Sequence, residues 1–382
     1  MDFDLQWLLI ALPVAFGLGW LASRLDLRQW KREQRDAPKA YFKGLNLLLN
    51  EQQDKAIDAF IEAVQSDPDT SELHFALGNL FRRRGEYERA VRVHQHLLQR
   101  GDLPRAERER AQHALAQDFL KAGLFDRAEE AFKALDGTPF ELEARLARLS
   151  LYERSREWRQ AIEIARHLER SGTGSFASRI SHYWCELALE AQAAHKDEDS
   201  GQALLNAIAA SPQSARGHVL TGQSLTRRGL HAEAMAAYAQ LIALNPEAFN
   251  LVAKDYAEAA LACGQQATAH ASLLAQYQRT PSMPLLLALE KVEPDRNAQC
   301  HRLQEHLRLQ PTLSAAQLLL SVRSNALPEP EASLINTALE RAGRPLQRYR
   351  CAACGFEAQH YFWQCPGCLG WDTYPPKRVE EL

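Results

Sequence analysis

Residues 215–246, ARGHVLTGQSLTRRGLHAEAMAAYAQLIALNP, place small and aromatic side chains at fixed intervals along the chain. Counted from Ala215, glycine stands at positions 8 and 15, alanine at 20, tyrosine at 24 and proline at 32. Small residues let two helices approach closely, an aromatic ring fills the space between them, and proline ends the second helix. The stretch therefore predicts a pair of antiparallel helices.

The same spacing occurs in other parts of the chain. Counted from Ala37, glycine, alanine, phenylalanine and proline stand at positions 8, 20, 24 and 32, and counting from Ser71 places glycine at 8 and 15. Weaker copies align on Gly123, Trp158, Ala203 and Gly264. These are tetratricopeptide positions, and we expect about seven units in residues 37–282, stacked into a superhelix because one helix pair cannot bury its own apolar face. Residues 283–345 lose the spacing but stay amphipathic, which predicts capping helices.

The N-terminal segment has the composition of a membrane anchor. Residues 5–22, LQWLLIALPVAFGLGWLA, contain no charged side chain, and about 20 apolar residues cross a bilayer as a helix. A cleaved signal peptide would need a basic leader, but acidic residues precede this run. Basic residues follow it from Arg24 onward, which predicts an anchor at 1–23, a juxtamembrane linker at 24–36 and a cytoplasmic location for the rest.

The end of the chain contains the most specific site pattern. Residues 351–376 read CAACGFEAQHYFWQCPGCLGWDTYPP, in which two C-x-x-C pairs are separated by ten residues. Four thiolates at this spacing predict a tetrahedral site with a closed set of ligands, which stabilises a fold rather than catalysing hydrolysis. The site takes one iron or zinc ion, and the sequence leaves the choice open. The predicted ligands are Cys351, Cys354, Cys365 and Cys368.

The repeats offer a candidate surface for protein partners. In this architecture the first helix of each unit lines a concave face, and polar or basic side chains there can pair with the carboxylates of a peptide. The alternative, that these are ordinary solvated charges, stays open. The candidate groove residues are Asn79, Arg82, Arg83, Lys121, Gln223 and Arg227.

The order of these parts resembles the lipopolysaccharide assembly protein B family of Gram-negative bacteria. The resemblance rests on the anchor, on PKAYFKGLNLLLNEQQDKAIDAFIEAV at 38–64, and on a rubredoxin-like end, RYRCAACGFEAQHYFWQCPGC, at 348–368. It implies an all-α chain with a tetratricopeptide superhelix, a single transmembrane helix and a metal ribbon at 346–376. One residue departs from the pattern: Leu369 stands where a rubredoxin knuckle usually has glycine.

The resemblance also implies a function. Members of the family present the deacetylase of the lipid A pathway to a membrane AAA+ protease, and they coordinate lipopolysaccharide synthesis with export. The expected location is the inner membrane, with a periplasmic N-terminus. The expected partners are this deacetylase, this protease, and lipopolysaccharide assembly and export proteins.

Other functions are less consistent with the sequence. A net charge of −3 gives no electrostatic reason to expect nucleic acid, and no nucleotide, zinc-protease or serine-hydrolase motif is present, so we expect no enzyme activity. The main alternative is a redox- or iron-sensing scaffold that uses the four cysteines. Oligomerisation and the native metal stay open.

Overall fold

The computed structural model describes residue 16 and residues 42–47, 49–50, 52–66, 70–293, 295–322 and 328–382. Apart from Phe16, the predicted anchor at 1–23 lies outside these residues, as does the predicted linker at 24–36. Within the described part of the chain, no helix combines the length and the apolar composition that crossing a bilayer requires.

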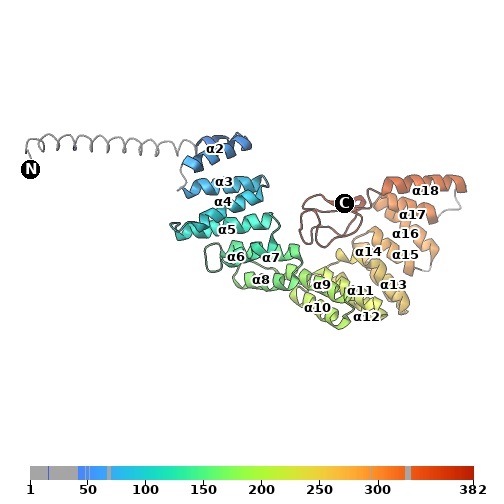
Figure 1. The fold of residues 1–382 in the computed structure, drawn as a ribbon. Coiled ribbons are helices and arrows are strands. Elements are labelled where there is room, and N and C mark those ends of the chain that lie inside the picture. The colour runs from blue at the N-terminus through green and yellow to red at the C-terminus, as the bar shows by residue number, and fades with distance from the viewer. Residues whose placement is uncertain are drawn as a thin grey trace, which may run out of the picture. The chain divides into compact units, whose positions relative to one another are not determined.

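The chain divides into two compact units, residues 1–160 and residues 161–382, which we call unit 1 and unit 2. Unit 1 is a series of helices in which each packs on the next, α3 on α4, α4 on α5 and α5 on α6 (Figure 1). The labelled helices of unit 1 are α2 (Gln53–Ser66), α3 (Ser71–Arg83), α4 (Tyr87–Gln99), α5 (Arg105–Lys121), α6 (Phe125–Lys133) and α7 (Glu141–Ser155).

Unit 2 continues the helical pattern and ends in a small ribbon. A helix that begins just before the boundary, α8 (Trp158–Arg170), leads into it. The further elements are α9 (Ala177–Ala193), α10 (Asp197–Ala210), α11 (Ala215–Arg227), α12 (His231–Leu244), η1 (Ala248–Leu251), α13 (Ala253–Ala262), α14 (Gln266–Arg279), α15 (Met283–Val292), α16 (Arg296–Leu309), α17 (Leu313–Val322), α18 (Glu329–Gly343), β1 (Tyr349–Arg350), β2 (Glu357–Ala358) and η3 (Val379–Glu381).

The glycines at position 8 explain how the two helices of one repeat fit together. Gly222 of α11 lies against the ring of Tyr238 on α12, and a Cβ at this glycine would overlap the ring. Gly78 stands in the same relation to the ring of His94. The spacing predicted these close approaches, although it did not single out His94, which takes the place of the usual aromatic residue.

Glycine at position 15 ends the first helix of a repeat. Gly85 has φ 81°, in the left-handed region that favours glycine, and the N–H of Glu86 then donates to Phe81 O at 2.9 Å. Gly229 has the same conformation after α11, with φ 75°. The sharp reversal brings the second helix back along the first.

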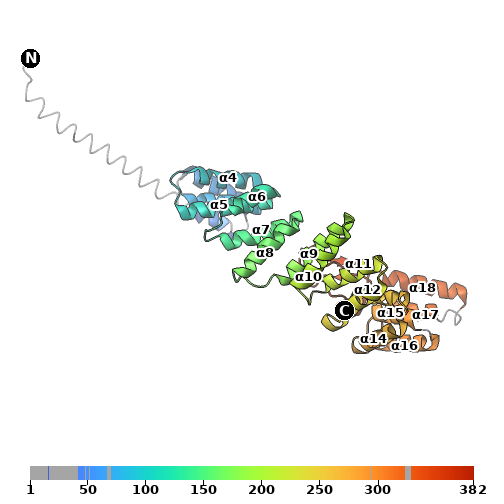
Figure 2. The same ribbon diagram turned by 90° about the horizontal axis from the view of Figure 1, so that it is seen from below.

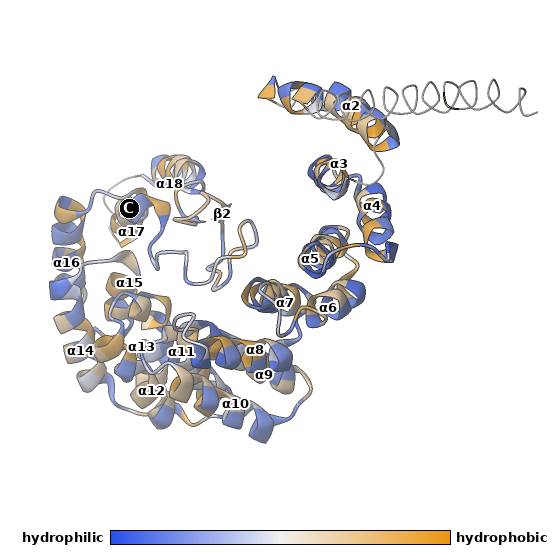
Figure 3. Ribbon diagram, turned by 90° about the vertical axis from the view of Figure 1, so that its left-hand side faces the viewer, coloured by the Kyte–Doolittle hydropathy of each residue, from blue (hydrophilic) through white to orange (hydrophobic). Residues whose placement is uncertain are grey.

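The core of unit 2 is continuous through its later helices. Buried apolar side chains of α11 to α17 form one cluster, and the helices that contribute have mixed apolar and polar faces (Figure 3). The segment predicted as capping helices, 283–345, forms α15 to α18, in which α15 packs on both α13 and α14 while α17 packs on α16 and α18. Figure 2 shows α14 to α18 grouped together. The stacking of helices therefore continues beyond the region where the repeat spacing is recognisable.

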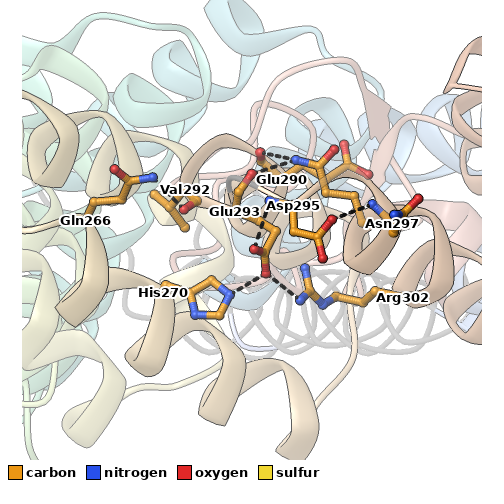
Figure 4. Close-up of polar contacts among 9 residues, drawn as sticks. Gln266, His270, Glu290, Val292, Glu293, Asp295, Asn297 and Arg302 are labelled. Atoms are coloured by element: carbon orange, nitrogen blue, oxygen red, sulfur yellow. Dashed lines mark hydrogen bonds and ion pairs between the residues drawn. The ribbon is translucent and has the colours of Figure 1, made fainter.

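A polar junction joins α14, α15 and α16. The Glu293 carboxylate accepts from His270 at 2.8 Å and from Arg302 at 3.1 Å, while the Gln266 amide donates to Val292 O at 2.8 Å (Figure 4). The Gln266 contact provides a hydrogen-bond partner for the end of α15, where backbone carbonyl groups lack partners within the helix.

Candidate metal centre

The four predicted ligand cysteines come together in the ribbon. Their Sγ atoms all lie within 4.8 Å of one another, with Cys351 to Cys368 at 3.9 Å and Cys354 to Cys365 at 3.6 Å. A tetrahedral ion with bonds of about 2.3 Å to sulfur separates its ligands by about 3.8 Å. The sulfur distances fit this geometry and are too long for disulfides. These four residues therefore form a site that can hold one zinc or iron ion.

Two matching turns hold the cysteines in place. In the first, Cys351 N–H donates to Phe356 O at 2.9 Å and Gly355 N–H donates to Cys351 O at 2.9 Å. In the second, Cys365 N–H donates to Gly370 O at 2.8 Å and the N–H of residue 369 donates back to Cys365 O at 2.8 Å. The ribbon therefore presents the two C-x-x-C pairs in nearly equivalent conformations.

Leu369 reproduces the glycine conformation of the first turn. Its φ is 60°, against 77° for Gly355. The departure from the rubredoxin pattern therefore changes the energy of the second turn more than its shape, because a side chain in the left-handed region costs about 1–2 kcal/mol.

Hydrogen bonds around Cys351 Sγ favour the thiolate form of this residue. The Thr373 hydroxyl lies 3.3 Å from Cys351 Sγ, and together with the backbone N–H groups of Cys354 and Ala353 it lowers the pKa of the Cys351 thiol to about 6, against the opposing effect of burial. Metal ions bind the thiolate, so these donors assist ligation.

The site is buried on one side and open on the other. Cys351 and Cys365 pack with Tyr374 in a small apolar cluster, whereas Cys354 and Cys368 are exposed. The Tyr374 hydroxyl donates to Phe356 O at 3.2 Å, which fixes the ring beneath the sulfurs. His360 is exposed and lies outside the group of four ligands.

The ribbon docks on the repeats of unit 2 through consecutive residues after the second cysteine pair. The Asp372 carboxylate accepts from His182 Nε2 at 2.8 Å and from the Ser178 hydroxyl at 3.0 Å, both on α9. Trp371 stacks on the His182 ring, with centroids 4.6 Å apart and planes 17° apart. Partial burial by itself raises the pKa of the Asp372 carboxyl, but His182, Ser178 and the Arg216 charge outweigh this effect and hold the pKa below its ordinary value.

A second tryptophan extends this contact. Trp363 packs against the apolar cluster of α11 to α17, and its ring lies 6.2 Å from that of His182. Arg216, only 5 % exposed, pairs with Glu186 at 2.6 Å and lies over Trp371. The partners of these aromatic side chains on the repeats depend on the tertiary fold, and the sequence pattern does not identify them.

The last residues of the chain contact two helix N-termini, which sequence reasoning missed. Glu381 Oε1 accepts from the backbone N–H of Met283 at 2.8 Å, at the first residue of α15. Glu380 accepts from the backbone N–H and the hydroxyl of Ser314, in the first turn of α17. Carboxylates are favourable at helix N-termini because of the unpaired N–H groups and the helix dipole. Two acidic residues in a C-terminal tail give no sequence signal for these partners.

The groove residues predicted from the repeats lie in both units. The Arg82 guanidinium already has hydrogen-bond partners within unit 1. It donates to Asp118 at 2.9 Å, to Ala114 O at 3.0 Å and to Asn79. The other oxygen of Asp118 lies 2.5 Å from Nδ1 of the buried His94. Arg83, Lys121 and Arg227 are exposed, and Asn79 and Gln223 are half-buried. Their role as a groove stays a prediction.

Comparison with known protein families assigns a family to the helical repeats and to the cysteine ribbon. The model of a rubredoxin metal binding domain matches residues 349–376, and tetratricopeptide repeat models match residues 73–109, 113–175 and 185–249. The chain is therefore a tetratricopeptide-repeat protein with a C-terminal rubredoxin-type metal ribbon.

The relatives narrow this class to one family. The chain is 32 % identical over 388 residues to lipopolysaccharide assembly protein B of Escherichia coli (strain K12), covering 98 % of each chain. It is 26 % identical over 399 residues to the protein of the same name from Haemophilus influenzae, covering 99 % of each. A tetratricopeptide repeat protein from Parabacteroides merdae has a solved structure with TM-score 0.34 and 15 % identity, over 67 % of this chain and 98 % of that one. The chain belongs to the lipopolysaccharide assembly protein B family.

Proposed function

We propose that this protein acts in lipopolysaccharide assembly as a membrane-anchored cytoplasmic adaptor without catalytic activity. In this role it presents the deacetylase of the lipid A pathway to a membrane AAA+ protease, and so couples lipopolysaccharide synthesis to export. The observation that carries the proposal is the match to relatives named lipopolysaccharide assembly protein B along 98 % of the chain, repeats and metal ribbon included.

The described architecture supports a binding role. Stacked helix pairs present extended surfaces, and the ribbon packs on these repeats through Trp371, Asp372 and Trp363. In the proposal, the apolar segment 5–22 anchors the chain in the inner membrane, with its N-terminus periplasmic. Anchoring confines the client and the protease to one membrane plane and so raises their effective concentration.

A crosslinking pull-down from cells tests the proposal directly. We expect the full-length protein to recover the deacetylase and the protease, and the Cys351→Ser/Cys354→Ser variant to recover less of both. Cys185→Ser is the matched control, because this buried thiol lies outside the metal site and burial raises its pKa to about 12. Failure of the unmodified protein to recover either partner would refute the adaptor role.

Deletion of residues 1–23 tests the anchor separately. We expect the shortened protein to fold and bind the deacetylase in vitro, but to leave deacetylase levels in cells unregulated. Normal regulation by the shortened protein would count against tethering while leaving the binding role intact.

The exposure of Cys354 and Cys368 favours a second candidate function, a redox- or iron-sensing scaffold. An iron ion held by four sulfurs changes oxidation state, and exposed ligands allow electron transfer or metal loss. Metal analysis of the protein purified without added metal distinguishes the two functions. A zinc-loaded protein that keeps full regulation in cells removes the sensing function.

A further inference from the structure

A cleft of about 830 Å³ lies beside the docked ribbon in unit 2. One side is formed by the ribbon, including Tyr361 and Trp363, and the other by the starts of α9, α11 and η1, including Ser214 and Glu247. Its volume is in the range of protein sites that enclose a ligand or a few side chains. None of the four ligand cysteines and none of the candidate groove residues lines it, although Ala352, Ala353, Thr373 and Tyr374, which surround the sulfurs, form part of its ribbon side.

The charge of the lining has one sign. Its carboxylate side chains are Glu247 and Asp372, and no lysine or arginine lines it. Glu247 is exposed and forms no ion pair with any residue that the structure describes. Asp372 uses one oxygen, Oδ2, for both His182 and Ser178. Its other oxygen is therefore available, and the cleft complements a cation.

The ribbon side of the cleft is aromatic and rigid. The rings of Tyr361 and Trp363 lie 5.0 Å apart at 80°, and the Tyr361 hydroxyl donates to Tyr374 O at 3.1 Å. Two prolines, Pro375 and Pro376, continue this wall. Planar guanidinium groups stack on aromatic faces and bind carboxylates through paired hydrogen bonds, whereas an ammonium group acts as a point charge.

Polar groups on the repeat side suit a peptide backbone. The Ser214 side chain does not cap α11, although it stands at the N-cap position. The Asn245 side-chain oxygen accepts from Ala248 N–H at 3.2 Å, which leaves its amide N–H groups as donors toward a ligand. Donors and hydroxyls beside an aromatic wall match an extended segment with alternating side chains.

We propose that this cleft binds an extended, arginine-bearing peptide segment of a protein partner. The inference rests on the proposed adaptor function and identifies the chemistry of one partner segment. The binding site lies at the junction of ribbon and repeats, so both must be in place for the cleft to form.

Titration of the full-length protein in detergent with blocked synthetic peptides tests this inference. The peptide ALRPRLA is compared with ALEPELA and ALQPQLA while fluorine NMR follows 5-fluorotryptophan, and Trp363→Phe identifies the Trp363 resonance. We expect ALRPRLA alone to shift this resonance saturably. Glu247→Arg should weaken its binding at least about fivefold, and Glu233→Arg on α12, exposed and outside the cleft, should leave it unchanged.

Each contrary result overturns the inference. No saturable shift with ALRPRLA, equal shifts with all three peptides, or unaltered binding by Glu247→Arg would each exclude an arginine-selective cleft. The titration uses neither the deacetylase nor the protease. A failed titration with an intact pull-down therefore rejects the cleft alone, whereas a failed pull-down rejects the adaptor function whatever the titration gives.

Discussion

Leu369 and Asp372, two residues close in sequence to the last ligand cysteine, both have left-handed backbone conformations. Their φ angles are 60° and 54°. Aspartate tolerates this region better than leucine does, because its short polar side chain forms local hydrogen bonds. In this protein the Asp372 carboxylate binds α9, whereas the Leu369 side chain is 49 % exposed. The strain at Asp372 accompanies a docking contact, and the strain at Leu369 has no such compensation.

We therefore predict that Leu369→Gly stabilises the ribbon. Relief of the left-handed side chain gains about 1–2 kcal/mol, and the greater freedom of glycine in the unfolded chain returns about 0.5–1 kcal/mol of this. A net gain of about 0.5–1 kcal/mol in the free energy of unfolding should appear in chemical denaturation of the metal-loaded protein. Leu369→Ala keeps the Cβ and should give no gain. Equal stabilisation by both variants would show that backbone strain is not the cause.

Glu290 is a residue whose surroundings destabilise the charged form of its carboxyl group. Its Oε1 atom is buried without a hydrogen-bond partner among the described residues, beside the junction drawn in Figure 4. Burial raises the pKa of the Glu290 carboxyl above its ordinary value of 4.5, and the Arg302 charge offsets only part of this effect. A raised pKa in an acid means that the ionised form destabilises the fold.

Glu290→Gln should therefore stabilise the protein at neutral pH, by about 0.5–1 kcal/mol. This gain in stability should be complete above the raised pKa of Glu290. It should disappear as the pH falls below about 4.5, where the wild-type carboxyl is protonated in both the folded and the unfolded state. Thermal melting between pH 4 and pH 8 measures the difference. Glu258→Gln on α13 is the control with the opposite sign, because the bond from Lys291 lowers the pKa of Glu258. A pH-independent effect of Glu290→Gln would contradict this explanation.

At the scale of elements, one short segment belongs to both the metal centre and the contact with the repeats. In residues 371–374, Trp371 and Asp372 bind α9, the Thr373 hydroxyl lies beside Cys351 Sγ, and Tyr374 packs under the sulfurs. Thr373 O also accepts from Ala352 N–H at 2.8 Å. A change in the conformation of this segment cannot alter one contact and leave the other in place.

A double-mutant cycle with His182→Ala and Asp372→Ala measures the contact between ribbon and α9. We expect a coupling of about 0.5–1 kcal/mol, modest because the Asp372 side chain is 47 % exposed. The same residues paired with Ser155→Ala, whose hydroxyl donates to Leu151 O within α7, should give additive effects. Additivity of the His182 and Asp372 substitutions would mean that their bond does not hold the ribbon in place.

At the scale of the whole molecule, the ribbon connects parts of unit 2 that are distant in sequence. The ribbon itself contacts α9, and the tail that follows it contacts α15 through Glu381 and α17 through Glu380. The tail also returns to the ribbon, where Val379 N–H donates to Arg348 O at 2.8 Å. Residues from 178 to 381 are thus joined around one small metal site. We therefore expect the stability of α9, α15 and α17 to depend on whether the ribbon is folded.

Removal of the metal should therefore destabilise unit 2 far from the ligands. In the Cys351→Ser/Cys354→Ser variant, or after chelation, we expect faster amide hydrogen exchange in α9, α15 and α17 and a fall in the melting temperature of roughly 5 °C or more. Exchange in α3 to α6 of unit 1 should change little. Acceleration confined to residues 346–376 would show that the ribbon does not stabilise the repeats.

The sequence by itself determined the helix pairs and the cysteine pairs that can hold a metal ion, because both follow from interactions between residues close along the chain. Gly222 and Tyr238 lie within one repeat, and each cysteine pair lies within one turn, so spacing alone predicted these contacts. Only the tertiary structure decided which repeats receive the ribbon, that Glu380 and Glu381 bind helix N-termini, and that Arg82 of the predicted groove is bound to Asp118. These contacts join residues up to 194 positions apart. Their partners depend on how successive helices stack, and a local pattern of side chains does not encode that arrangement.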